Sequence, residues 1–306
     1  MTSGKQKNRN KLLIIARESK IKITRKAATL ILVIGAIDSI YTSIVPYAYT
    51  YVKTIGGNLI MKTELINYIE NEFQATYYDI STLNFSNNME ALEYIKRTIK
   101  SLSMPVIFFI KPDLSSSMRS MSLEDTCYMI FMKSIPESSR SLTEIAHEFG
   151  HFYYVEKGYP QTRLSSGEYI DVVMATILSN TVMDPMINRG LFNEGIDIVE
   201  YMRDAVVVQA PNLMFGYPEY NKMDKYQKHF VKCLLIEKIQ EWEIIKNAIP
   251  NTFVEIAEKK YKRILVESRN FAKKINATGT DTPEKCKKLL KMLVEENNMR
   301  DEILII

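Results

Sequence analysis

Apolar residues recur along most of this chain at the three- and four-residue spacing that is typical of amphipathic helices. The spacing predicts helices over residues 58–74, 88–103, 165–190, 196–208, 225–248, 252–275 and 283–297. Two short runs rich in β-branched and aromatic residues, PVIFFI at 105–110 and CYMIFM at 127–132, predict strands instead. The pattern therefore predicts a mostly helical α+β fold with a small sheet.

Turn and cap signals punctuate this pattern. The serine-rich stretch SSSMRSMS at 115–122 and the stretch PNLMFGYPEY at 211–220 are expected to be loops. Thr252 with Glu255 predicts a capping box at the start of helix 252–275, and Thr282 is expected to cap the last helix. Lys and Glu alternate in the C-terminal helices, which we interpret as a solvated face or, less simply, as a partner-binding surface.

One further helix is predicted from Ser141 onward, because Ser141 and Glu144 have the spacing of a capping box. Apolar residues follow at helical spacing and give this helix an apolar face on the side away from its two histidines: Ile145, Phe149 and Phe152. Gly150 lowers helix stability by about 1 kcal/mol relative to alanine. A close neighbour packed over the histidines would explain a glycine at this position.

This helix carries the sequence HEFGH at 147–151, which includes two of the chain's three histidines. Histidines four residues apart lie on one helix face, so His147 and His151 can bind a single metal ion, and zinc suits the spacing. Glu148 is placed to take a proton from a metal-activated water, which is the general-base role in peptide hydrolysis. The third histidine, His229, lies in a basic amphipathic segment where a surface or core role is expected.

A zinc site needs at least one more protein ligand, and helix 165–190 offers three carboxylates. Asp184 is favoured because Asn180, Asp184 and Asn188 form a polar stripe in an otherwise apolar helix. Buried polar groups need partners, and a metal with its surrounding hydrogen bonds would supply them. Asp171 and Glu168 remain the alternative ligands.

The motif at 147–151 resembles that of the zincin metallopeptidases. The stretch NTVMDPMIN at 180–188 resembles the N-x-x-x-D-x-x-I-N segment of bacterial predicted metallopeptidases, some of them grouped with the ImmA/IrrE-type peptidases. The resemblance covers about residues 105–200 and implies a minimal zincin-like domain with an HExxH active-site helix. It implies these roles: zinc ligation by His147 and His151, a general base at Glu148, and a role for Asp184 as a ligand or as the partner of one. The chain lacks both the N-E-x-x-S-D segment of thermolysin-like enzymes and the third histidine of metzincins, which leaves the third ligand and the substrate open.

The first 26 residues form a basic tail. They contain nine Lys and Arg against Glu18 alone, a balance of +8. The net charge of the whole chain is +4, so the remaining residues together carry −4. Such a tail can contact nucleic acid or an anionic membrane weakly, or it can simply be solvated. The whole chain, with 46% hydrophobic and 25% charged residues among 306, has a globular composition.

Residues 27–52 are the most apolar stretch, and they have the length of a membrane-spanning helix. However, Asp38 lies near the middle, where a carboxylate costs about 2.5–3.5 kcal/mol, and Pro46 follows. The segment is therefore either a buried or interfacial helix or a membrane anchor. The three cysteines are odd in number and far apart, which favours a reducing compartment and hence a cytoplasmic protein, with a membrane-anchored protein as the alternative.

These observations predict a zincin-like metallopeptidase domain at 53–222, with a C-terminal helical region at 223–306 packed on it. The predicted function is zinc-dependent hydrolysis of a protein or peptide substrate. Strand 127–132 would either bind the substrate backbone as an edge strand or lie inside the sheet. The alternative function is a non-catalytic or structural-zinc interaction protein that uses residues 1–26. The sequence leaves the oligomeric state open.

Overall fold

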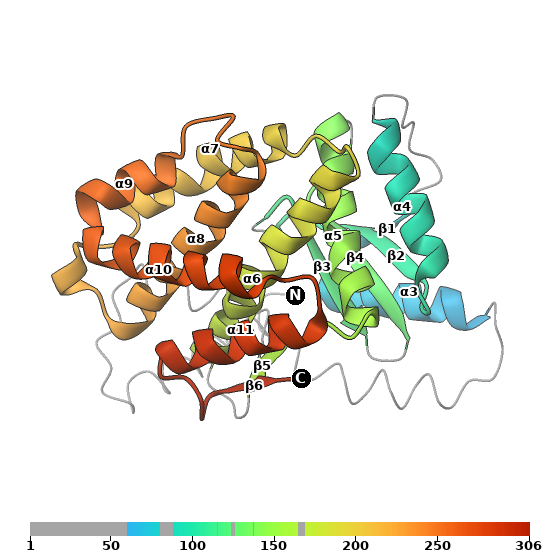
Figure 1. Ribbon diagram of the computed structural model, residues 1–306. Helices are drawn as coiled ribbons and strands as arrows, with labels where there is room; N and C mark the ends of the chain where they lie inside the picture. The colour runs from blue at the N-terminus through green and yellow to red at the C-terminus, as the bar shows by residue number, and fades with distance from the viewer. Residues whose placement is uncertain (1–59, 80–87, 115, 124–125, 137, 165–168) are drawn as a thin grey trace. The chain divides into compact units, whose positions relative to one another are not determined.

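A computed structural model describes residues 60–79, 88–114, 116–123, 126–136, 138–164 and 169–306. The helices are α3 (Ile60–Phe73), α4 (Met89–Ser101), α5 (Ser139–Glu156), α6 (Tyr169–Asn193), α7 (Val199–Phe215), α8 (Lys225–Ile244), α9 (Thr252–Lys260), α10 (Lys262–Thr278) and α11 (Pro283–Glu296). The strands are β1 (Thr76–Tyr78), β2 (Val106–Ile110), β3 (Met118–Leu123), β4 (Cys127–Met132), β5 (Thr162–Leu164) and β6 (Ile303–Ile305). The predicted mostly helical α+β fold is confirmed (Figure 1).

The main sheet has the strand order β1-β2-β4-β3, in which β2 and β4 are parallel and the outer strands are antiparallel to their neighbours. All six residues of β4 are buried, so this strand lies inside the sheet and is not its edge. The edge strand next to it is β3, and the prediction of a loop at 115–122 is wrong for residues 118–122. Met118 and Leu123 anchor β3 in the core, whereas serines between them hide the strand pattern in the sequence.

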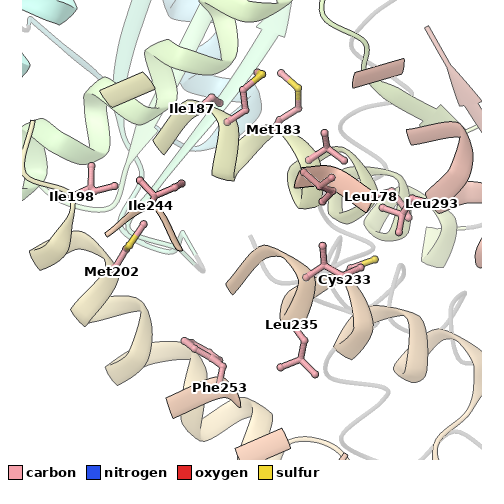
Figure 2. Close-up of a cluster of buried hydrophobic side chains, with 14 of the residues drawn as sticks. Leu178, Met183, Ile187, Ile198, Met202, Cys233, Leu235, Ile244, Phe253 and Leu293 are labelled. Carbon is pink, nitrogen blue, oxygen red and sulfur yellow. The ribbon is translucent and has the colours of Figure 1, made fainter. Parts of the chain in front are cut away.

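Helix α5 packs against the sheet on one side and against α6 on the other. Phe149 of α5 lies on Phe108 of β2, with 6.0 Å between the ring centroids. Helix α6 also packs along α8, and the core continues into the C-terminal helices. Figure 2 shows part of this cluster, which includes Leu178, Met183 and Ile187 of α6, Met202 of α7, Cys233 and Leu235 of α8, Phe253 of α9 and Leu293 of α11.

Two predictions about the C-terminal half are wrong. Residues 252–275 form two helices, because the fully buried Tyr261 leaves helical geometry and donates its hydroxyl to the carbonyls of Leu213 and Tyr217. The cap of α9 is Asn251, not Thr252, since the Asn251 side chain accepts from the backbone N–H of Val254. Tertiary burial therefore overrides the continuous helical pattern at this point.

The predicted loop at 211–220 begins five residues late. Pro211 lies inside α7, which continues to Phe215. A proline inside a helix leaves one carbonyl without its partner, and α7 exposes this region of its surface at Val207 and Val208, where solvent can satisfy that carbonyl. The loop begins only at Gly216.

No helix in the described part of the chain is both long enough and apolar enough to cross a membrane. The basic tail at 1–26 and the apolar segment at 27–52 lie outside the described residues. The described residues from 60 onward belong to one compact unit.

Candidate metal centre

The helix that carries the histidines begins earlier than the sequence indicates. Ser138 is the N-cap of α5, and its hydroxyl accepts from the backbone N–H of Ser141 at 3.2 Å. The predicted capping box of Ser141 and Glu144 is therefore wrong. Glu144 is buried one turn into the helix, and it accepts a 2.9 Å hydrogen bond from Arg140, which also pairs with Asp204 of α7. An ion pair thus fixes α7 against the start of α5.

Gly150 lets α5 and α6 approach closely. A Cβ at this position would lie 2.5 Å from Cγ2 of Ile187, far inside van der Waals contact. The close neighbour expected at Gly150 is therefore confirmed, and it belongs to α6. Asp184 lies one turn before Ile187 on the same helix, so the contact brings its carboxylate toward the histidines of α5.

The side chains of the three predicted ligands lie close together. Oδ1 of Asp184 lies 3.4 Å from Nε2 of His151 and 3.9 Å from Nε2 of His147, and one ligand atom from each residue falls within 4.8 Å of the others. Two ligands bound about 2.1 Å from a tetrahedral zinc ion lie about 3.4 Å apart. The pair of Asp184 and His151 has this spacing, and the wider distances to His147 would have to shorten for all three atoms to bind one zinc ion.

The charge and hydrogen bonding of the cluster also suit a cation. Oδ1 of Asp184 is buried without a hydrogen-bond partner among the described residues. Burial, followed by the nearby carboxylates of Glu237 and Glu241, raises the pKa of Asp184 well above its usual value. Burial and the neighbouring His147 lower the pKa of His151 to about 3, so its imidazole is neutral at physiological pH. A neutral imidazole beside an unpaired carboxylate belongs to the donor set that zinc requires.

A hydrogen-bonded chain extends behind His147. Nδ1 of His147 lies 2.8 Å from Oδ1 of Asn188, whose Nδ2 donates to Oε1 of Glu241 at 2.7 Å. Lys238 donates to Oε2 of Glu241 at 2.8 Å and to Glu237 at 2.6 Å. Lys238 and Glu241 are only 3% and 2% exposed, so the interpretation of the C-terminal Lys and Glu residues as a solvated face is wrong for this pair. Sequence reasoning missed these α8 residues because their partners lie far away in the chain.

Tyr201 was also not identified from the sequence. It lies in the first turn of α7, and its ring centroid is 5.6 Å from that of His147. Burial raises the pKa of Tyr201 well above its usual value, and the nearby carboxylates of Glu241, Asp184 and Glu148 raise it further. The phenol therefore stays protonated and lies among the groups of the candidate site.

Two of the alternative ligands cannot be compared with the cluster, because their side chains lie outside the described part of the structure. Glu168 lies outside the described residues, and Asp171 falls in α6 at a point where side chains are not described. His229 is half-buried on α8, where burial and nearby lysines lower its pKa to about 4. Of the three proposed carboxylates, Asp184 is the one that the described structure brings to His147 and His151.

A hollow of about 700 Å³ opens on another side of α6, between Tyr154, Arg189, Glu243 and Asp281 among other lining residues. None of the three residues of the metal cluster lines it. Its α6 residues lie on the helix face opposite Asp184, so the hollow is separate from the candidate metal centre.

Comparison with protein-family models, with curated proteins and with solved structures gives no match.

Proposed function

We propose that this protein is a zinc-dependent peptidase. The observation that carries the proposal is the convergence of His147, His151 and the unpaired carboxylate oxygen of Asp184, with Glu148 directly after the first histidine. Bound zinc would supply a Lewis acid that polarises the scissile carbonyl and makes the attacking water more acidic.

Glu148 is the proposed general base. Its carboxylate is half-buried, and it lies close enough to Asp184 and Tyr201 to raise the pKa of both groups. Glu148 takes a proton from water as the C–O bond forms, and the proton then passes to the amide nitrogen as the C–N bond breaks. The protonated phenol of Tyr201 donates to the oxygen that becomes negative in the transition state.

The edge of the sheet suggests how a substrate binds. Among the described residues β3 pairs only with β4, so it is an edge strand with no strand paired on its other side. Helix α5 packs beside β3, which brings this edge near the metal centre. An extended peptide that added to β3 would present its backbone along the site, so we propose an unstructured protein or peptide segment as substrate.

Exposure favours a catalytic metal over a structural one. The side chain of His151 is 21% exposed and that of Asp184 is 15% exposed, whereas His147 is 5% exposed. A structural zinc is usually enclosed by four protein ligands, whereas the described residues offer three at this cluster, two of them partly exposed. The three cysteines are buried and free, which supports a reducing compartment such as the cytoplasm.

The test is hydrolysis of an unfolded protein such as casein by the zinc-loaded full-length chain and by Glu148→Gln. We expect the wild type to cleave, and the variant to keep its zinc while losing about 10²–10⁴-fold in rate, the usual contribution of a general base. A chain that binds no zinc after zinc is supplied, or equal rates for both proteins, would refute the proposal.

A further inference from the structure

The hydrogen-bonded chain behind His147 crosses three helices. It runs from His147 on α5 through Asn188 on α6 to Glu241 and Lys238 on α8. Asn188 is fully buried, and Lys238 and Glu241 are almost fully buried. The orientation of buried polar groups is held by their hydrogen-bond partners. A change in the hydrogen bonds of Glu241 therefore alters those of Asn188 and, through it, of His147.

The chemistry of the partners sets the direction of every hydrogen bond. An ionised Glu241 can only accept, so the amide NH₂ of Asn188 must face it and the amide oxygen must face His147. Nδ1 of His147 must then carry the proton and donate it to that oxygen. The lone pair of the ring consequently lies on Nε2, which is the nitrogen next to Asp184.

Lys238 forms a buried ion pair with Glu241, at 2.8 Å from Oε2. Its ammonium donates to Glu241 and to Glu237 while the surrounding helices exclude most solvent from it. Within the described part of the chain, Glu241 lies near these groups: the ammonium of Lys238, the amide of Asn188, the phenol of Tyr201, and the carboxylates of Glu237 and Asp184.

We propose that Glu241, held by Lys238, is a positioning residue of the metal centre, which orients the amide of Asn188 and thereby fixes the tautomer of His147 that can bind a metal. The inference rests on the proposed zinc site and extends it to Glu241, which lies ninety residues after His151 in the sequence. Partners of metal-bound histidines commonly act in this way, and their loss lowers metal affinity by about 10–100-fold.

Glu241→Gln tests whether zinc binding depends on the direction of these hydrogen bonds. The most favourable orientation of the new amide turns its oxygen to Lys238 and its NH₂ to Asn188, which must flip in response. The flipped Asn188 then presents its NH₂ to Nδ1 of His147, and the proton moves to Nε2. We expect zinc affinity to fall by about 10–100-fold and the absorption spectrum of the Co²⁺-substituted protein to change.

The matched control is Glu243→Gln, the same change on the same helix. Glu243 is exposed, and it accepts a hydrogen bond from Asn276, which is not part of the chain behind His147. Zinc affinity and the Co²⁺ spectrum should equal those of the wild type.

Asn188→Asp combined with Glu241→Gln provides a rescue. The aspartate introduced at position 188 would accept both from His147 and from the new glutamine at position 241. The amide oxygen of that glutamine would accept from Lys238, so His147 and Lys238 donate as in the wild type, and only the hydrogen bond between positions 188 and 241 reverses its direction. We expect zinc affinity to recover toward that of the wild type, because substitutions at contacting residues are not additive. Asn188→Asp alone sets two carboxylates against each other and should bind zinc more weakly than the double variant.

Titration of each full-length protein with Zn²⁺ and with Co²⁺ decides the outcome. Wild-type affinity in Glu241→Gln, or a double variant that binds no better than Glu241→Gln, would overturn the inference. If Glu241→Gln fails to fold, the double variant alone decides, because recovery of the wild-type Co²⁺ spectrum supports the inference and its loss refutes it. A wild type that binds no zinc refutes the proposed function itself, whereas zinc binding without an effect at Glu241 refutes only the positioning role.

Discussion

Replacing Gly150 with alanine places a methyl group where α5 and α6 touch. The new Cβ would lie 2.5 Å from Cγ2 and 3.3 Å from Cγ1 of Ile187, while carbon atoms normally stay about 3.5–4.0 Å apart. Ile187 is 1% exposed and branched at Cβ, so its methyl group cannot swing away into solvent. The helices must therefore separate by about 1 Å, or the side chain must leave its rotamer.

The magnitude follows from two opposed effects. Overpacking of a core costs about 1–3 kcal/mol, whereas alanine stabilises a helix by about 1 kcal/mol relative to glycine. The net free energy of unfolding should fall by up to about 2 kcal/mol, and zinc affinity should fall as well, because the separation moves Asp184 away from the histidines. Urea unfolding and a zinc titration measure the two effects.

Gly190→Ala is the control for this experiment. Gly190 also lies within a helix, but its new Cβ would meet only the terminal hydroxyl of Tyr154 at 3.0 Å, which can move aside. This variant should be as stable as the wild type or more stable, with unchanged zinc affinity. The close-packing explanation of Gly150 is refuted if Gly150→Ala behaves like Gly190→Ala.

Two further predictions concern Tyr201 and His229. Tyr201→Phe should lower the rate of peptide hydrolysis by about 10²–10³-fold, because it removes a hydrogen-bond donor to the transition state. Zinc affinity should not change, since no ligand is lost. Single-turnover rates measure the effect, and an unchanged rate would exclude Tyr201 as this donor. His229 has a pKa of about 4 in the folded chain and about 6.5 when unfolded, so the unfolded state binds about one more proton between these pH values. The free energy of unfolding should consequently fall as the pH drops from 6.5 toward 4. In His229→Gln, urea unfolding at several pH values should show a smaller fall over this range. An equal fall in both proteins would contradict the effect assigned to the burial of His229.

Elements with strong local signals could be predicted from the sequence. Helix α4 begins after its cap at Asn88, strand β4 has the predicted bounds, and α11 begins after its cap at Thr282. The pair His147 and His151 was also predictable, because residues four apart on a helix share one face whatever the rest of the fold does.

The missed features depend on contacts between distant parts of the chain. Lys238 and Glu241 belong to the alternating Lys and Glu residues that are typical of an exposed helix face. The packing of α8 against α6 buries them, and Glu241 accepts a hydrogen bond from Asn188. Tyr261 likewise interrupts a helical pattern because its hydroxyl is needed by carbonyls more than forty residues earlier. Periodicity along the sequence contains no information about these partners.

The zinc content of the purified full-length chain, measured by elemental mass spectrometry beside Asp184→Ala and Asp171→Ala, tests the central claim most directly. The account predicts about one zinc per chain in the wild type and in Asp171→Ala, and its loss or clear weakening in Asp184→Ala, which lacks the third ligand. Wild-type protein without zinc after zinc is supplied, or Asp184→Ala with a full zinc content, would contradict it.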